Sequence, residues 1–357
     1  MPQNETQQDE PRQDEPKQDE PLRDGTLPGG EALAPVAFAA HGMAAEALAQ
    51  GATLSDLLVP AGDGLRRVVL GFADRRHYRP NPAHVGATAG RYANRIGGAR
   101  FILDGQTHAL PVNDGGRNTL HGGPQGFGQQ PWQLAARSTG AVTFRRLSPA
   151  GEAGFPGALT ATCTYALPEP GVLRVTLTAT ADAPTVVNLA HHSYFTLLPG
   201  SSVRGYDLQV RAARFTPVDD ALIPTGEIAP VAGTPFDFRT FRRLDHWGDG
   251  TFAYDINFVL DRAGPGLAHA ATVRSAAAGL ALEVWTTEPG LQVYDAKYLG
   301  PEPVCRDGFR PFPHAAICLE AQRFPDSPNK PGFPSAVLRP GAEYRQVTEY
   351  RFRPFSG

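Results

Sequence analysis

Two adjacent histidines, His191 and His192, stand out as residues that could do chemistry. They lie in Asn188-Leu-Ala-His-His-Ser-Tyr-Phe195, among apolar and aromatic residues and after a strand-like run. An imidazole titrates near neutral pH, where a proton donor is useful to an enzyme. Successive side chains of an extended strand point to opposite faces, so we expect only one of the two imidazoles to enter a given pocket.

Glu320 is the strongest candidate for a partner to that imidazole. Its carboxylate ends the apolar run Ile317-Cys-Leu-Glu320, and a Pro-rich turn follows. Cys318 is interpreted as a buried strand residue beside the site, because nothing in the sequence indicates the lowered thiol pKa of a nucleophile.

Two glycine-containing stretches offer further polar groups. Asn94 and Arg95 lie between glycines in residues 90–98, where the backbone can turn sharply or approach a ligand closely. His121 precedes a pair of glycines. Each stretch also has a structural interpretation, a surface turn with an ion pair for the first and a turn cap for the second. The residues alone leave these alternatives open.

Two later segments carry polar groups on an apolar background. Asp255 and Asn257 interrupt an apolar run at the spacing that puts both on one strand face. A buried carboxylate is costly unless it is paired or used, although Asp255 could also cap the start of the strand. Gln292 is a plausible hydroxyl partner, whereas Glu288, in the turn before it, is interpreted as solvated.

Together these groups suit a polyhydroxylated ligand such as a sugar. Such a ligand needs donors and acceptors at fixed places and apolar or aromatic walls, for which Tyr194, Phe127 and Trp285 are candidates. The sequence shows no phosphate-binding glycine loop, dinucleotide fingerprint or zinc-protease pattern. The formal net charge of −3 gives no basic footprint for nucleic acid or an anionic membrane, and no apolar run approaches the ~20 residues that span a bilayer.

The elements that must position these residues are predicted to be strands. From about residue 33 onward, short apolar runs are separated by Gly, Pro, Asp and Asn, which is typical of an all-β sandwich. Residues 172–179 alternate with period two, and Asp104-Gly105 between two runs predicts a hairpin. Residues 67–72 are predicted as a further strand, and residues 39–49 as the best of few, short helices. No linker divides residues 33–357, so we expect a single domain.

Residues 1–32 differ in kind from the rest. Gln-Asp-Glu-Pro occurs three times in this polar segment. We expect a disordered tail, because such a segment cannot bury enough surface to offset its ordering entropy. It has no apolar region of the kind that marks a secretory signal. The three scattered cysteines indicate reduced thiols, so we expect a cytoplasmic protein.

An ordered set of motifs, more specific together than any one alone, covers nearly everything from about residue 50 to the end. The motifs are Gly90-Arg-Tyr-Ala-Asn-Arg-Ile96, Asn118-Thr-Leu-His-Gly-Gly123, Gly126-Phe127 with Trp132, Asn188 with His192-Ser-Tyr-Phe195, Leu222-Ile-Pro-Thr-Gly-Glu-Ile228, Gly233-Thr-Pro-Phe-Asp-Phe238, Tyr254-Asp-Ile-Asn-Phe258, Pro289-Gly-Leu-Gln-Val-Tyr294 and Leu319-Glu-Ala-Gln-Arg-Phe-Pro-Asp326. In this order they resemble the aldose 1-epimerase, or galactose mutarotase, family.

The resemblance implies a large antiparallel β-supersandwich and an enzyme without cofactor or metal. Such an enzyme interconverts the α and β anomers of aldohexoses such as D-glucose and D-galactose. By motif position, the resemblance implies Glu320 as the general base and His192 as the general acid. It also implies a monosaccharide as partner, no nucleic acid or membrane, and a monomer or homodimer. The sugar contacts it implies are Asn94, Arg95, His121, Asp255 and Gln292, with Tyr194 inside the histidine motif.

The chain departs from the family pattern at several positions. His191 stands where the family usually has Asn, Ile256 replaces a usual His and Glu288 a usual Gln. Gly128 stands where Asp customarily follows the Phe, and residues 295–298 also differ. None of these changes removes a proposed acid, base or arginine, so we expect them to affect substrate preference more than reaction type.

Two rival functions are compatible with the residues. A glycoside hydrolase could use Asp255 and Glu320 as its two carboxylates. A non-catalytic sugar-binding or sensor protein could keep the pocket without the chemistry, although the presence of both acid and base candidates disfavours it.

Overall fold

The computed structural model describes residues 31–62, 64–249 and 252–357. The tail expected for residues 1–32 lies outside the described residues apart from its last two, and it stays a prediction. In the described part of the chain, no helix is long and apolar enough to cross a membrane.

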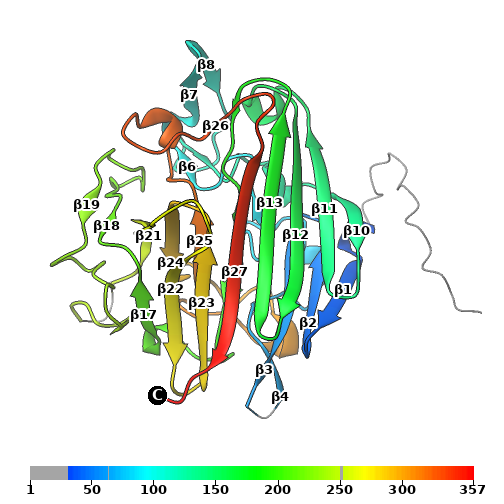
Figure 1. Cartoon of the computed structure of the whole chain (residues 1–357), viewed down its shortest axis with the longest axis vertical. Helices are drawn as coiled ribbons and strands as arrows, with labels where there is room; N and C mark the ends of the chain where they lie inside the picture. Colours follow the sequence, from blue (N-terminus) through cyan, green and yellow to red (C-terminus); the bar gives the residue numbers. More distant parts are fainter. Residues whose placement is uncertain (1–30, 63, 250–251) are drawn as a thin grey trace, which may run out of the picture.

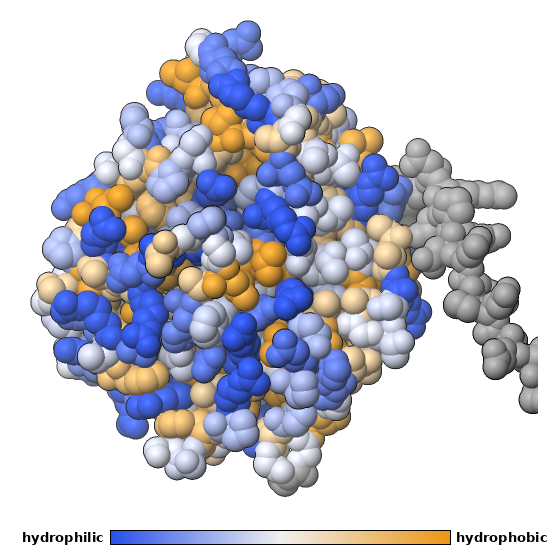
Figure 2. Space-filling view, in the orientation of Figure 1, coloured by the Kyte–Doolittle hydropathy of each residue, from blue (hydrophilic) through white to orange (hydrophobic). Residues whose placement is uncertain are grey.

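A nine-stranded antiparallel sheet forms one layer of the molecule (Figure 1). The alternation predicted for residues 172–179 appears in its long central strand, where nearly every second side chain is buried. Seen from this side, hydrophilic side chains spread over the surface with apolar groups scattered between them (Figure 2). In sheet order the strands are β10 (Gln133–Arg137), β11 (Ala141–Ser148), β12 (Leu159–Glu169), β13 (Val172–Ala181), β27 (Tyr344–Pro354), β23 (Leu280–Thr286), β22 (Ala268–Ser275), β17 (Asp207–Val210) and β20 (Arg242–Arg243).

A six-stranded antiparallel sheet packs against the large one. The Tyr350 hydroxyl donates to the Leu319 carbonyl at 3.0 Å, and Gln346 Nε2 donates to the Ala321 carbonyl at 2.6 Å. A cluster of buried apolar side chains with members in both sheets joins the layers. The strands in order are β16 (Tyr194–Phe195), β25 (Ile317–Gln322), β24 (Gly290–Tyr294), β21 (Asp255–Val259), β18 (Arg214–Phe215) and β19 (Ala229–Pro230).

Smaller elements complete the described structure. A four-stranded sheet contains β1 (Pro35–Ala40), β2 (Met43–Leu48), β3 (Thr53–Ala61) and β4 (Gly64–Arg67). The two-stranded pairs are β5 (Thr88–Ala89) with β15 (Ala190–His191), β6 (Arg95–Ile96) with β9 (Thr119–Leu120), β7 (Arg100–Leu103) with β8 (Gln106–Ala109), and β14 (Thr185–Val186) with β26 (Val337–Leu338). The helical segments among the described residues are 3-10 turns: η1 (Glu31–Leu33), η2 (Arg75–Tyr78), η3 (Gly97–Ala99), η4 (Phe127–Gln129), η5 (Glu152–Gly154), η6 (Val203–Gly205), η7 (Arg306–Gly308) and η8 (Ser327–Asn329).

The all-β class and the hairpin at Asp104-Gly105 are confirmed, since these two residues join β7 to β8. The helix predicted for residues 39–49 is wrong. These residues form a hairpin of β1 and β2 around His41 and Gly42, whose φ angles are 53° and 73°. Two successive positive φ values make the tight turn that suits twisted strands. Pairing with β3 then overrides the helix propensity of the alanines.

The strand predicted for residues 67–72 is also largely wrong. β4 ends at Arg67, and beyond it the backbone makes only isolated bridges, from Val69 to Phe195 and from Phe72 to Cys305. This segment runs through the interior beside β16 instead of joining a sheet, so its apolar pattern reflects burial rather than pairing.

Candidate active site

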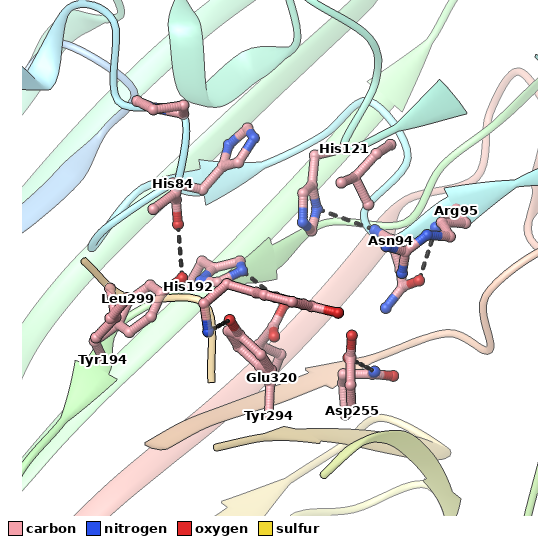
Figure 3. A pocket seen from close by; sticks show the side chains of 15 residues that line it. His84, Asn94, Arg95, His121, His192, Tyr194, Asp255, Tyr294, Leu299 and Glu320 are labelled. Carbon is pink, nitrogen blue, oxygen red and sulfur yellow. Dashed lines mark hydrogen bonds and ion pairs between the residues drawn. The ribbon is translucent and has the colours of Figure 1, made fainter. Parts of the chain in front are cut away.

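A cavity of about 380 Å³ opens on the face of the six-stranded sheet that carries Gln292 and Glu320 (Figure 3). Its volume lies within the range of small-molecule sites. All eight residues predicted from the sequence line it, although they come from segments more than 200 residues apart. They are Asn94, Arg95, His121, His192, Tyr194, Asp255, Gln292 and Glu320.

Strand register places Glu320 on the cavity floor. In β25 it lies directly opposite Gln292 of β24, which in turn lies opposite Asn257 of β21. Residues directly opposite each other in antiparallel strands share a sheet face, so these three polar side chains form a row. The neighbouring Leu319 and Val293 point to the other face and join the apolar core.

The two adjacent histidines point to opposite sides, as the alternation predicts. His191 packs between Tyr165 and Tyr350, with ring centroids 5.4 and 5.7 Å away. His192 faces the cavity instead. Its backbone is held on both sides, because its N–H donates to the Ala87 carbonyl and its carbonyl accepts from Gly86 N–H, each at 2.9 Å.

His192 and Glu320 face each other across the cavity floor. His192 Nε2 lies 3.6 Å from Glu320 Oε2, and the two side chains are only 7% and 3% exposed. This distance is longer than a direct hydrogen bond. Glu320 Oε2 is buried without a hydrogen-bond partner among the described residues, so it is available to a ligand.

Burial sets the proton affinities of this pair. It raises the pKa of Glu320 to about 8, helped by the nearby charge of Asp255 and opposed by Arg95. It lowers the pKa of His192 to about 3, with a smaller contribution from a charge on His84. At pH values between about 3 and about 8, the pair therefore holds a single proton, which resides on Glu320.

His121 is fixed in one tautomer by Asn94. The backbone N–H of Asn94 donates to His121 Nδ1 at 3.1 Å. Since burial also lowers the pKa of His121 well below its ordinary value, the ring is neutral and carries its proton on Nε2. His121 thus presents an N–H donor rather than an acceptor. Asn94 and His121 both have positive φ, and both line the cavity.

Arg95 is held in place by Asp114, a residue that the sequence reasoning did not single out. Arg95 Nε donates to Asp114 Oδ2 at 3.1 Å, and Nη2 donates to Oδ1 at 3.4 Å. The other arginine of this motif, Arg91, is buried and donates to the carbonyls of Pro156 and Gly157, so it has a structural role. Arg95 therefore combines the two alternatives left open by the sequence, since it forms an ion pair and also lines the cavity.

Asp255 and Gln292 form one polar unit on the wall of the cavity. Gln292 Nε2 donates to Asp255 Oδ1 at 2.7 Å. Burial raises the pKa of Asp255, while Arg95 and the Gln292 hydrogen bond oppose that rise. The unit offers carboxylate and amide oxygens to hydroxyl groups.

Two of the aromatic residues suggested as walls lie elsewhere. Phe127 is buried in the main apolar cluster, and Trp285 packs on Arg351 outside the cavity. The aromatic lining consists of Tyr194, Tyr294 and Tyr298. The sequence did not separate these roles because the side to which an aromatic residue points depends on how its segment packs against distant parts of the chain.

Glu288 is buried, not solvated as the sequence suggested. It is 2% exposed and lies 3.4 Å from Arg323 Nε. Burial raises its pKa to about 7, while Arg323 and Arg262 oppose that rise. It is not among the residues that line the cavity, so its carboxylate is a structural group.

One group within the described ranges could offer three ligand atoms to a metal ion. His192, Cys318 and Glu320 place one ligand atom each within 4.8 Å of one another. A thiol binds metals as the thiolate. Burial raises the pKa of Cys318 well above its ordinary value, which works against a metal at this place.

His84 lines the cavity as well, although nothing in the sequence singled it out. It stands in an irregular segment between η2 and β5, where neither periodicity nor a recognised motif marks a residue. Its proximity to the other histidines arises only from the tertiary structure, with its ring centroid 4.5 Å from that of His121.

Comparisons with known proteins agree with this geometry. Residues 36–351 match the family model described as aldose 1-epimerase. The chain is 40% identical over 322 residues to an aldose 1-epimerase of Escherichia coli, an alignment covering 87% of this chain and 92% of that protein. It is 39% identical over 315 residues to the galactose mutarotase of Homo sapiens, covering 87% and 91%. Among solved structures, an aldose epimerase homologue from C. elegans superimposes with a TM-score of 0.85 at 30% identity, covering 90% of this chain and 99% of that one.

Proposed function

Because the chain belongs to the aldose 1-epimerase family, it interconverts the α and β anomers of aldoses, and we propose that Glu320 and His192 carry the proton transfers. The observation that supports this assignment is the 3.6 Å approach of His192 Nε2 to Glu320 Oε2 at the floor of a cavity lined by hydroxyl-binding groups. The proposed substrates are aldohexoses such as D-glucose and D-galactose.

Mutarotation needs two coupled proton movements. Glu320 removes the proton from the hydroxyl on C1 while His192 gives a proton to the ring oxygen, and the C1–O5 bond breaks to give the open aldehyde. After rotation about C1–C2, Glu320 returns its proton to the aldehyde oxygen as the C5 hydroxyl attacks C1 and gives its proton to His192. Closure on the opposite face yields the other anomer, and both residues recover their initial states.

The pair carries the same number of protons throughout this cycle. In the free enzyme the single proton of the pair resides on Glu320, so it first passes to His192, whose Nε2 lies 3.6 Å from Glu320 Oε2. Ring opening then starts from a Glu320 carboxylate and a His192 imidazolium, and it ends with both groups neutral. The neutral pair is the arrangement favoured by the pKa of about 8 for Glu320 and about 3 for His192. Burial thus stabilises the enzyme form that accompanies the open-chain aldehyde, and the cycle needs no proton from solvent.

The remaining polar residues hold the sugar while its ring is open. The His121 N–H, the Arg95 guanidinium and the Asp255–Gln292 unit supply donors and acceptors in the lining of the cavity. Fixing the hydroxyls keeps C1 beside the C5 hydroxyl, so that closure is faster than escape of the aldehyde.

Polarimetry of freshly dissolved α-D-glucose and α-D-galactose tests the activity. We expect the protein to accelerate the approach to anomeric equilibrium beyond the rate in buffer alone. Aryl glucosides and galactosides serve as controls, since a mutarotase releases no aglycone from them. No acceleration across a panel of aldoses, or aglycone release, would contradict the proposal.

We further propose that residues 33–357 form one domain that works in the cytoplasm as a monomer or homodimer, without nucleic acid or membrane partners. Support comes from the apolar cluster, whose members within this range run from Phe38 to Phe352, and from the free, buried state of Cys163, Cys305 and Cys318. Light scattering after size-exclusion chromatography measures the oligomeric state, and cell fractionation locates the protein.

A further inference from the structure

We propose that His84 binds the exocyclic C6 hydroxyl of the sugar and so makes this site selective for hexoses. The proposal deepens the function above and rests on it. Figure 3 shows His84 beside His121 and on the opposite side of the cavity from Asp255. The His84 ring centroid lies 4.5 Å from that of His121 and 6.1 Å from that of His192.

The backbone around His84 is built to hold this side chain. His84 has a φ of 53°, which is unfavourable for a residue with a side chain and is kept only where its surroundings enforce it. Its N–H donates to the Asn81 carbonyl, and its carbonyl accepts from Ala87 N–H, each at 3.0 Å. The fully buried Asn81 side chain closes the same segment by bonding both the N–H and the carbonyl of Val85. Ala87 and Gly86 then bond the backbone of His192, so His84 and His192 are fixed relative to each other.

Room for the His84 ring depends on the absence of a side chain at residue 128. A Cβ added to Gly128 would lie 3.1 Å from His84 Nδ1 and 3.2 Å from the Ala87 methyl group. The histidine and the glycine therefore fit each other. Gly128, where the family customarily has Asp, thus leaves room for the polar side chain of His84, which lines the cavity.

His84 has the chemistry of a hydroxyl-binding group. It is 8% exposed, and its Nδ1 is buried without a partner among the described residues. Burial lowers its pKa to about 4, so the ring is neutral at neutral pH and has one donor and one acceptor nitrogen. Because Nδ1 lies buried beside Gly128, Nε2 is the nitrogen of His84 that a ligand hydroxyl in the cavity would meet.

The position of the proton-transfer pair identifies which hydroxyl His84 meets. Glu320 acts at O1 and His192 at the ring oxygen O5. The Asp255–Gln292 unit lies beside Glu320, because Gln292 is the strand neighbour of Glu320. This unit is therefore assigned to the C2 hydroxyl, and the ring runs from C1 toward C2 on that side. In the other direction from O5 come C5 and its hydroxymethyl group, on the side of His192 where His84 stands.

Steady-state mutarotation of D-galactose and its 2-, 3-, 4- and 6-deoxy analogues tests the assignment. His84→Phe keeps the ring volume and removes both nitrogens. For D-galactose and the 2-, 3- and 4-deoxy sugars, we expect KM to rise about threefold to tenfold, as for the loss of one hydrogen bond, with kcat within about twofold. For 6-deoxy-D-galactose, wild type and variant should have the same KM.

Two further variants and a control complete the test. Gly128→Ala should displace the His84 ring and reproduce the KM pattern of His84→Phe, which keeps the proposal testable if that variant folds poorly. His84→Asn, which tolerates a positive φ and keeps polar atoms, should show a smaller rise in KM. His108→Phe, at a histidine stacked on Phe101 outside the cavity, should leave all values unchanged.

An equal rise in KM on all five sugars, or no rise on D-galactose, would overturn the proposal and leave His84 as a packing residue. Insensitivity of a different deoxy sugar would overturn the assignment to C6. A wild-type protein that mutarotates none of the sugars would instead mean that the proposed function fails.

Discussion

Asn94 and His121 bind each other through two reciprocal hydrogen bonds. The Asn94 N–H donates to His121 Nδ1, and the His121 N–H donates to the Asn94 carbonyl, both at 3.1 Å. The first bond fixes the tautomer of the imidazole, and the second fixes the distance between the two chain segments. Two segments separated by the β7–β8 hairpin thus present one N–H donor in a set direction.

This arrangement predicts different effects for two amide replacements of His121. The amide of His121→Gln can reach the place of Nε2–H, whereas the amide of His121→Asn can replace only Nδ1. We expect kcat/KM for D-galactose to fall about tenfold more in His121→Asn than in His121→Gln, on the scale of one hydrogen bond. Equal losses measured by polarimetry would show that donation from Nε2 is unimportant.

The proton-transfer pair predicts non-additive losses. Glu320→Gln and His192→Asn should each lower kcat by about 10²–10⁴-fold, because each removes one half of a concerted proton transfer. The double variant should be little worse than the more impaired single variant. Calorimetric titration with galactose should give dissociation constants within a few fold of wild type. Multiplicative losses in the double variant would indicate that the two residues act in separate steps.

The activity should decline at high pH. Above about pH 8 Glu320 loses the proton of the pair while His192 is neutral, so no proton is left for the ring oxygen. We expect kcat/KM to fall about tenfold per pH unit beyond this point, after subtraction of the hydroxide-catalysed background. Asp255→Asn should move this decline to lower pH, because the Asp255 charge raises the pKa of Glu320. A decline unmoved by this substitution would assign it to another group.

Asp114 should contribute to sugar binding through Arg95. Asp114→Asn weakens the ion pair that orients the guanidinium, so we expect KM to rise about threefold to tenfold with little change in kcat. Asp104→Asn is the matched control, because the Asp104–Arg339 pair has similar geometry but lies on the surface with both side chains at least half exposed. An unchanged KM in Asp114→Asn would mean that Arg95 is held by its packing alone.

Glu288 should make the protein less stable as the pH rises. Its pKa is raised from 4.5 to about 7 in the folded state, so the folded protein holds this proton more tightly than the unfolded chain. Relative to Glu288→Gln, wild type should lose stability between pH 4.5 and 7, by at most about 3 kcal/mol. Urea unfolding at pH 4.5 and pH 8 measures this difference. Exposed Glu302→Gln should show no such pH dependence, and an equal response of the two variants would contradict the burial argument.

The sequence predicts much of the fold because the relevant signals are local. Alternation marks β13, and Asp104-Gly105 marks the turn between β7 and β8. Where partners decide the conformation, the prediction fails. The alanines of residues 39–49 have the propensity of a helix but pair as two strands, and residues 67–72 have the apolar pattern of a strand but make only isolated bridges.

In the candidate site, too, the sequence predicts the residues that local signals mark and misses those that depend on distant partners. Motif residues such as His192 and Glu320 could be selected because their neighbours in sequence set their faces and the family resemblance set their order. His84 and Asp114 could not, since each matters only through a contact made in the folded chain, with His121 and Arg95 respectively. The burial of Glu288 likewise depends on distant residues such as Arg323.

Asn257, Gln292 and Glu320 form their row only when β21, β24 and β25 are correctly aligned, so turnover depends on this alignment. If β25 moved by one residue along β24, Leu319 would enter the cavity and Glu320 would be driven into the apolar core. A misaligned molecule could keep its strand content and much of its compactness, yet it would lack the proposed base at the proper place. The mutarotation activity recovered after denaturation would therefore measure the fraction of molecules with the correct strand register. Circular dichroism alone would overestimate that fraction.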